Sequence, residues 1–158
     1  MRIIFIILLH VTLFATSYDF DEIKFVNAVG TDFKQSGMIE VLNDRTIITY
    51  TEPRFKEIIK TDNNITIKGK SGDVYTLKGK ALFYTNLFIG VMTRLGNFNE
   101  LKANSDFEVQ KEKNMYYLRF KGDIADSIIR AEVTTKNSKV LSFKMFMPNE
   151  DRLEIIKK

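Results

Sequence analysis

The sequence contains no cysteine, no tryptophan and a single histidine, His10. Without cysteine the chain can form neither a disulfide nor a thiolate metal site. His10 lies within the apolar N-terminal segment, so the rest of the chain also lacks imidazole. This excludes Ser-His-Asp and Cys-His nucleophilic sites, and ordinary zinc, copper and haem ligation. We therefore predict a protein that is not an enzyme and has no metal and no cofactor.

The first residues, MRIIFIILLHVTLFATS, have the layout of a secretory signal peptide. Arg2 gives a short positive start, and residues 3–14 form an apolar run of about 12 residues, which is too short to span a bilayer comfortably. Ala15 and Ser17 occupy the −3 and −1 positions of a cleavage site. We predict a signal peptide over 1–17, one domain over 18–158 and export to the periplasm. The alternative is an uncleaved membrane anchor.

The composition is that of one globular domain. Of 158 residues, 44% are hydrophobic and 28% are charged, which argues against disorder. A mature chain of roughly 140 residues can bury a core without disulfides. The net charge is +4, and the lysines are scattered along the sequence. Scattered charge indicates a solvated face; a nucleic-acid or anionic-lipid surface is the alternative, and the export signal argues against nucleic acid.

Short apolar–polar alternations separated by turn residues predict an antiparallel meander. In Arg45–Thr51, for example, Ile48 and Tyr50 share one phase, and Pro53 cannot continue the ladder. The predicted strands are 37–42, 45–51, 55–60, 65–68, 74–78, 106–110, 115–121, 128–135, 139–147 and 152–156.

Spacing of three and four replaces spacing of two between residues 81 and 95, which predicts a helix with a wide apolar stripe that Gly96 ends. A shorter helix is predicted over 19–28, from the spacing of Phe20, Ile23 and Val26 behind an acidic start. The fold class is therefore α+β. The inward-facing residues of the strands should form one apolar sheet face, which these helices cover. Besides the cavity-facing residues named below, the predicted inward-facing residues are Phe107, Val109, Ile129, Ala131, Val133, Leu141, Leu153 and Ile155.

Two arrangements satisfy this pattern. Helices and sheet can pack into a filled core, or they can enclose a cavity for an apolar ligand, since ligand sites are concave and mostly apolar. Periodicity alone does not choose between them.

The order of motifs resembles that of the LolA-like family of periplasmic lipoprotein and lipid carriers, over nearly the whole mature chain and most closely its compact branch. The motifs are F-x-x-x-G-x-I-x-V (Phe33, Gly37, Ile39, Val41), Y-x-x-P (Tyr50, Pro53), I-I-K-T, D-N-N-x-x-I, the central helix with G-x-x-x-x-L (Gly96, Leu101), D-F-E-V, Y-x-L-x-F and P-N-E-D-R-L-E-I.

The resemblance implies a half-open antiparallel β-barrel of about ten strands, covered by a helical lid, with a hydrophobic cavity for acyl chains. It implies a monomeric carrier that takes a lipoprotein or related lipid from an inner-membrane release complex or exporter to an outer-membrane acceptor, with no nucleic-acid partner. The expected lipid-binding, cavity-facing residues are Ile39, Val41, Ile48, Tyr50, Ile58, Leu87, Phe88, Val91, Met92, Leu95, Tyr116, Leu118, Phe120, Phe143 and Met145.

This sequence departs from the family pattern in one place. Carriers of lipoproteins have an Arg-Pro pair before the second strand and a Trp within it, where this chain has Leu42-Asn43 and Ile48. The departure puts the family's gating in doubt and leaves the cargo open between a lipoprotein and another lipid or glycolipid. Two other functions stay open: a periplasmic interaction module with a filled core that binds through a sheet edge, and an enzyme using the acidic pairs Asp123/Asp126 or Glu150/Asp151.

Overall fold

The structure is a computed structural model, and it describes residues 16–94, 107–137 and 139–158. Among these residues it contains one antiparallel sheet, one α-helix and two short 3-10 turns. The helix α1 is Gly79–Arg94, and the turns η1 and η2 are Asn27–Val29 and Gly122–Ile124. The eleven strands are β1 Thr16–Val26, β2 Thr31–Val41, β3 Thr46–Glu52, β4 Lys56–Lys60, β5 Ile65–Gly69, β6 Val74–Thr76, β7 Phe107–Glu112, β8 Met115–Phe120, β9 Arg130–Lys136, β10 Lys139–Phe146 and β11 Arg152–Lys157.

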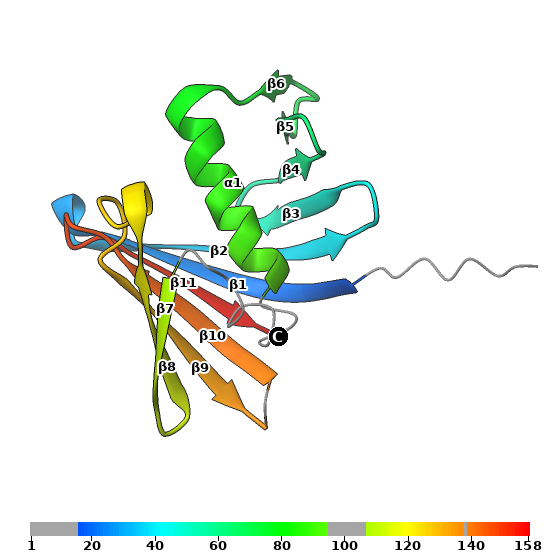
Figure 1. Ribbon diagram of the computed structural model, residues 1–158. Coiled ribbons are helices and arrows are strands. Elements are labelled where there is room, and N and C mark those ends of the chain that lie inside the picture. The colour runs from blue at the N-terminus through cyan, green and yellow to red at the C-terminus, as the bar shows by residue number, and fades with distance from the viewer. Residues whose placement is uncertain (1–15, 95–106, 138) are drawn as a thin grey trace, which may run out of the picture.

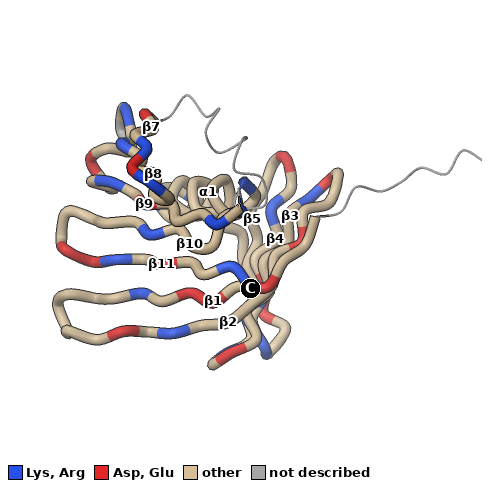
Figure 2. The backbone as a smooth tube through the Cα atoms, turned by 90° about the horizontal axis from the view of Figure 1, so that it is seen from below, with Lys and Arg blue, Asp and Glu red and all other residues tan. Residues whose placement is uncertain are grey.

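Strand β1 lies in the middle of the sheet, and the later strands extend the sheet on both sides of it. The spatial order is β6-β5-β4-β3-β2-β1-β11-β10-β9-β8-β7, so the first six strands run outward to one edge and the last five return from the other. The first and last strands pair with each other, with Phe20 opposite Lys157. Helix α1 is the connection that leads from one half to the other, and it lies inside the curve of the sheet (Figures 1 and 2).

Most of the predicted elements are confirmed. Helix α1 and the hairpin of β2 and β3 lie where the patterns put them, and β3 ends at Glu52, directly before Pro53. The sheet has eleven strands, and it stays open between the edge strands β6 and β7, so the half-open barrel covered by a lid describes it only roughly. The ends of two predicted elements, Leu95 with Gly96 and Asp106, lie outside the described residues, as does Leu101.

The predicted helix over 19–28 is wrong, because this segment is most of strand β1. Its inward phase is Tyr18, Phe20 and Glu22, all of them buried. Because the inward phase includes the carboxylate of Glu22, the apolar–polar alternation typical of a strand is not visible in the sequence. The three-residue spacing of Phe20 and Ile23 does not reflect a helix. Thr16 and Ser17 belong to the same strand; the signal cleavage after Ser17 stays a prediction.

Two predicted inward residues point to solvent instead. Ile129 is 56% exposed and precedes β9, while its neighbour Ile128 is buried. Leu141 is 41% exposed because the β9–β10 register shifts between Val140 and Ser142, so that Val140 takes the inward place. One residue of shift moves a side chain to the opposite face of a sheet.

Gly37 lets the centre of the sheet bend around a large side chain. The β2–β3 register shifts between Ser36 and Gly37. A Cβ at position 37 would lie 2.4 Å from the backbone oxygen of Thr49 and 3.0 Å from the ring of Phe20. Phe20, fully buried, in turn meets the ring of Tyr50 edge-on at 5.6 Å. Any other residue at 37 would push strands β2 and β3 apart.

Candidate functional site

A cleft of about 560 Å³ lies between the middle turns of α1 and the inner face of the sheet. Strands from both halves of the sheet contribute to it, together with the turn that joins β10 and β11. Its volume falls in the range of about 300–1,000 Å³ that is usual for small-molecule sites. The lining residues are Glu22, Lys24, Tyr50, Lys56, Ile58, Tyr84, Thr85, Leu87, Phe88, Ser127, Ile128, Met145, Met147, Pro148, Asn149, Asp151 and Leu153.

The greater part of the cleft wall is apolar. Leu87 and Phe88 of α1 are half-buried and form one side. Ile58 and Ile128 are each 5% exposed and Met145 is 4% exposed, and they form the sheet side. Branched, aromatic and thioether side chains give a surface that an alkyl chain can displace water from, and methionine adapts to irregular shapes.

A hydrogen-bonded group of polar side chains lies at one end of this wall. The Tyr50 hydroxyl donates to Glu22 Oε2 at 2.7 Å, and Gln35 Nε2 donates to Glu22 Oε1 at 3.1 Å. Each carboxylate oxygen of the buried Glu22 therefore has a donor, which is what a buried charge requires. Burial, followed by the nearby Glu22 charge, raises the pKa of Tyr50 well above its ordinary value. Tyr50 thus stays a neutral donor at physiological pH.

Lys56 extends over the same group from the neighbouring strand. Tyr50 and Lys56 are register partners, and the Lys56 ammonium lies 4.1 Å from the centre of the Tyr50 ring, in cation–π geometry. Burial lowers the pKa of Lys56; the charge of Lys24 adds to this, and that of Glu22 opposes it. Within the described part of the chain, no carboxylate approaches Lys24 or Lys56 to ion-pair distance.

Two tyrosine hydroxyls fasten α1 across the sheet. The buried Tyr18 of β1 donates to the carbonyl oxygen of Met92 in the last turn of the helix. Toward the other end, the hydroxyls of Tyr84 and Ser127 lie 2.9 Å apart. The helix buries Ile89, Val91 and Met92, which lie toward its C-terminus. The last turns of α1 are therefore anchored in the core, while its middle turns, from Tyr84 to Phe88, roof the cleft.

A second, smaller cavity of about 260 Å³ lies along another side of the same helix. Lys60 and Arg94 contribute its cationic groups, and Phe107 and Phe120 contribute rings. Lys56, Ile58 and Lys60 share the inward phase of β4, so that its two lysines reach different cavities.

The predicted lipid-binding residues fall into three groups. Those that line the cleft are Tyr50, Ile58, Leu87, Phe88 and Met145. Those that pack in the core or against it, without lining the cleft, are Ile39, Val41, Ile48, Val91, Met92, Tyr116, Leu118, Phe120 and Phe143. Leu95 lies outside the described residues. Whether these residues contact lipid stays a prediction. Because only the first group lines the cleft, we now restrict that prediction to those residues.

Sequence reasoning missed the polar residues of the site. Glu22 and Lys24 lie in the segment predicted as a helix, and Lys56 was expected on a strand but not in a site. The available signal was the two-residue spacing of Lys56 and Ile58, which puts the lysine on the same, inward face of the strand as the isoleucine. Of the acidic pairs considered for catalysis, Asp151 lines the cleft, and its carboxylate accepts a hydrogen bond from the Asn27 backbone N–H at 2.8 Å.

No protein-family model and no curated protein matches the chain. Among solved structures, it is similar to an outer membrane lipoprotein-sorting protein domain from Vibrio parahaemolyticus, at 7% identity and a TM-score of 0.42, covering 91% of this chain and 83% of that one. It is also similar to a DUF1329 family protein from Desulfovibrio piger, at 10% identity and a TM-score of 0.45, covering 93% and 85%. With TM-scores this low, neither bears on what this chain binds.

Within the described ranges, no helix combines the length and apolar character needed to cross a membrane.

Proposed function

We propose that this chain is a periplasmic, non-enzymatic carrier that holds the acyl chain of a lipoprotein or related lipid and carries it from the inner to the outer membrane. The observation that carries the proposal is the cleft of about 560 Å³ beneath α1, with Ile58, Phe88 and Met145 in its wall. The resemblance in motif order supports the same function. An inner-membrane donor and an outer-membrane acceptor of the acylated cargo are part of this proposal.

The energetics suit a carrier. Burying one methylene group stabilises a complex by roughly 0.8 kcal/mol, so a chain held over part of its length binds firmly while it can still be released. The buried last turns of α1 fix the helix on the sheet, while the half-buried side chains of Leu87 and Phe88 in its middle face the cleft and can adapt to the chain by changing rotamer. No catalytic group is needed for such a cycle.

The test is binding of a neutral acyl ligand, monomyristoylglycerol, followed by native mass spectrometry and by displacement of a fluorescent fatty-acid probe. Phe88→Glu places a charge in the cleft and should abolish binding. Phe83→Glu is the matched control, because Phe83 lies on the same helix, is 47% exposed and does not line the cleft. Circular dichroism and thermal unfolding establish that both variants are folded.

Binding of one acylglycerol per chain that survives Phe83→Glu and fails in folded Phe88→Glu would support the carrier. If the wild-type chain bound no acyl ligand, we would reject the carrier and favour the alternative function, a protein-interaction module. The exposed edge strand β6, with Val74 63% and Tyr75 56% exposed, would then be the surface to test for strand addition.

A further inference from the structure

We infer that the cleft selects acyl chains that end in an anion, and that Lys56 and Lys24 hold the carboxylate or phosphate of such a lipid at the end of the cleft. The inference rests on the proposed function and names its substrate class: a fatty acid or an anionic phospholipid with a single chain in the cleft. It follows from which charged groups in the cleft already have partners and which do not.

The four ionisable side chains of the cleft other than tyrosine are Glu22, Lys24, Lys56 and Asp151. Both carboxylates are engaged. Glu22 accepts hydrogen bonds from Tyr50 and Gln35, and Asp151 accepts one from the Asn27 backbone. Both oxygens of Glu22 and the Oδ1 atom of Asp151 therefore already accept hydrogen bonds from within the protein.

The two lysines are in the opposite situation. Among the described residues, the Lys56 ammonium lies over the ring of Tyr50 and is attracted by the charge of Glu22, but no carboxylate comes within ion-pair distance of it, and an ammonium group carries three donors. Lys24 is exposed at the same end of the cleft, and its charge acts on Lys56. Two cations in one partly desolvated space repel each other, and an anion between them removes that repulsion and supplies acceptors.

The apolar wall fixes the orientation of the ligand. Lys56 and Ile58 follow each other in the inward phase of β4, so the cationic end of the cleft passes directly into its apolar part, where Phe88 and Met145 lie. A lipid with an anionic group at one end of an alkyl chain matches this sequence of surfaces. A neutral headgroup without an anionic group fits the apolar part equally well but gains nothing at the lysines.

The test compares ligands with one chain and different headgroups: myristate, lysophosphatidylglycerol and neutral monomyristoylglycerol, each by displacement of the fluorescent probe at low and high salt. We expect the anions to bind about tenfold more tightly than the acylglycerol, as for a charge-assisted hydrogen bond, and the difference to shrink at high salt. Lys56→Met should reduce that preference to about twofold or less. Lys24→Met should reduce it in part.

Lys60→Met is the matched control, since Lys60 lies on the same strand and in the same phase but faces the smaller cavity. It should keep the full preference. Myristate and lysophosphatidylglycerol together distinguish a carboxylate from a phosphate. Equal affinity for anionic and neutral lipids would overturn the inference while leaving the carrier intact, and loss of the preference in Lys60→Met but not in Lys56→Met would move the anion to the other cavity. Failure of all three acyl ligands to bind would instead contradict the proposed function.

Discussion

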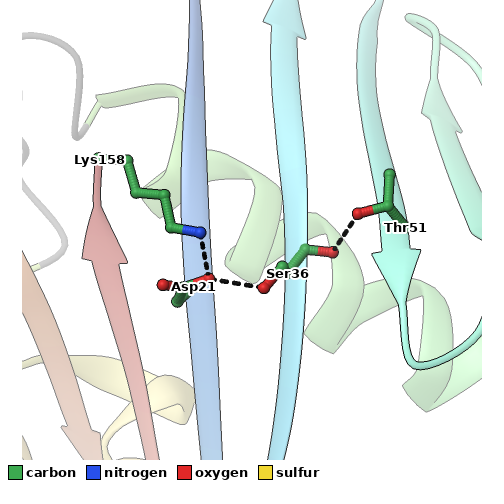
Figure 3. A network of polar contacts seen from close by, with 4 residues as sticks. All are labelled: Asp21, Ser36, Thr51 and Lys158. Carbon is green, nitrogen blue, oxygen red and sulfur yellow. Dashed lines mark hydrogen bonds and ion pairs between the residues drawn. The ribbon is translucent and has the colours of Figure 1, made fainter.

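The two faces of the sheet are built from the same strands and are held in different ways. On the inner face, Phe20, Phe143 and Ile155 have no exposed surface and pack beneath α1. On the outer face, Lys158 forms an ion pair with Asp21, and the Asp21 carboxylate also accepts a hydrogen bond from Ser36. The Thr51 hydroxyl donates to the backbone carbonyl of Ser36, so one chain of polar contacts crosses neighbouring strands (Figure 3).

This difference between the faces indicates which contacts contribute most to the stability of the chain. Apolar burial contributes most of the stability of a domain, whereas exposed ion pairs contribute about 0–1 kcal/mol each. Polar contacts on the inner face, such as that of Tyr50 with Glu22, act where water is excluded and should therefore weigh more than those outside. Four paired experiments test this contrast, from the largest expected effect to the smallest.

Ile155 and Ile156 are consecutive residues of β11 on opposite faces. Ile155 is fully buried, while Ile156 faces outward and is half-exposed. We expect Ile155→Ala to lower the free energy of unfolding by about 2–5 kcal/mol, as for a core cavity, and Ile156→Ala to lower it by roughly 1 kcal/mol or less. Urea unfolding at neutral pH measures both, and equal losses would contradict the division into two faces.

Stability should fall in alkali because the inner face buries two tyrosines. Burial raises the pKa of Tyr18 and of Tyr50 above the ordinary value of about 10. Above that pH the unfolded chain loses both protons while the folded chain keeps them, so the free energy of unfolding decreases as pH rises. At pH 11 the loss is about 1.4 kcal/mol for each tyrosine.

Urea unfolding between pH 8 and pH 11 gives the slope for the wild type and for a Tyr18→Phe/Tyr50→Phe variant. The double variant should be less stable at pH 8 and should lose less stability on going to pH 11. Tyr75→Phe is the comparison at an exposed tyrosine of β6. If it flattened the profile as much as the double variant does, burial on the inner face would not be the cause.

Tyr50 and Thr51 are neighbours on β3 that hydrogen-bond on opposite faces. Tyr50→Phe removes a donor from buried Glu22 and should cost about 1.5–2 kcal/mol, because the carboxylate oxygen is left unsatisfied. Thr51→Val removes an exposed bond to the Ser36 carbonyl and should cost less than about 0.5 kcal/mol. Thermal unfolding measures both, and a larger cost for Thr51→Val would reverse the assigned importance of the two faces.

The same contrast explains what the sequence could predict. The alternation in β3 and the helical spacing of Leu87, Val91 and Met92 are local signals, and both elements form where they indicate. Strand β1 was missed because its inward phase continues from Phe20 into charged residues, and the first of these, Glu22, is held by contacts with β2 and β3 later in the chain. Apolar periodicity marks a core, but it cannot mark inward charges, and these distinguish the cleft from the core.

The smallest expected effect lies on the outer face, at Asp21. Hydrogen bonds from Lys158 and from Ser36 hold the pKa of Asp21 below its ordinary value. The stabilisation is present above the ordinary carboxylate pKa near 4 and is lost as pH falls through the lower, folded-state value. Because the group is close to solvent, water and salt screen it, and Asp21→Asn should cost less than about 1 kcal/mol at neutral pH.

Asp19→Asn supplies the matched control, since Asp19 is exposed on the same strand and phase and changes the net charge equally. Thermal unfolding at neutral pH and near pH 3, with and without added salt, separates the two variants. We expect a small deficit for Asp21→Asn that disappears in acid and shrinks in salt, and none for Asp19→Asn. A deficit above about 2 kcal/mol would exceed what an exposed pair provides and would mean that the polar chain across β11, β1, β2 and β3 holds the two halves of the sheet together.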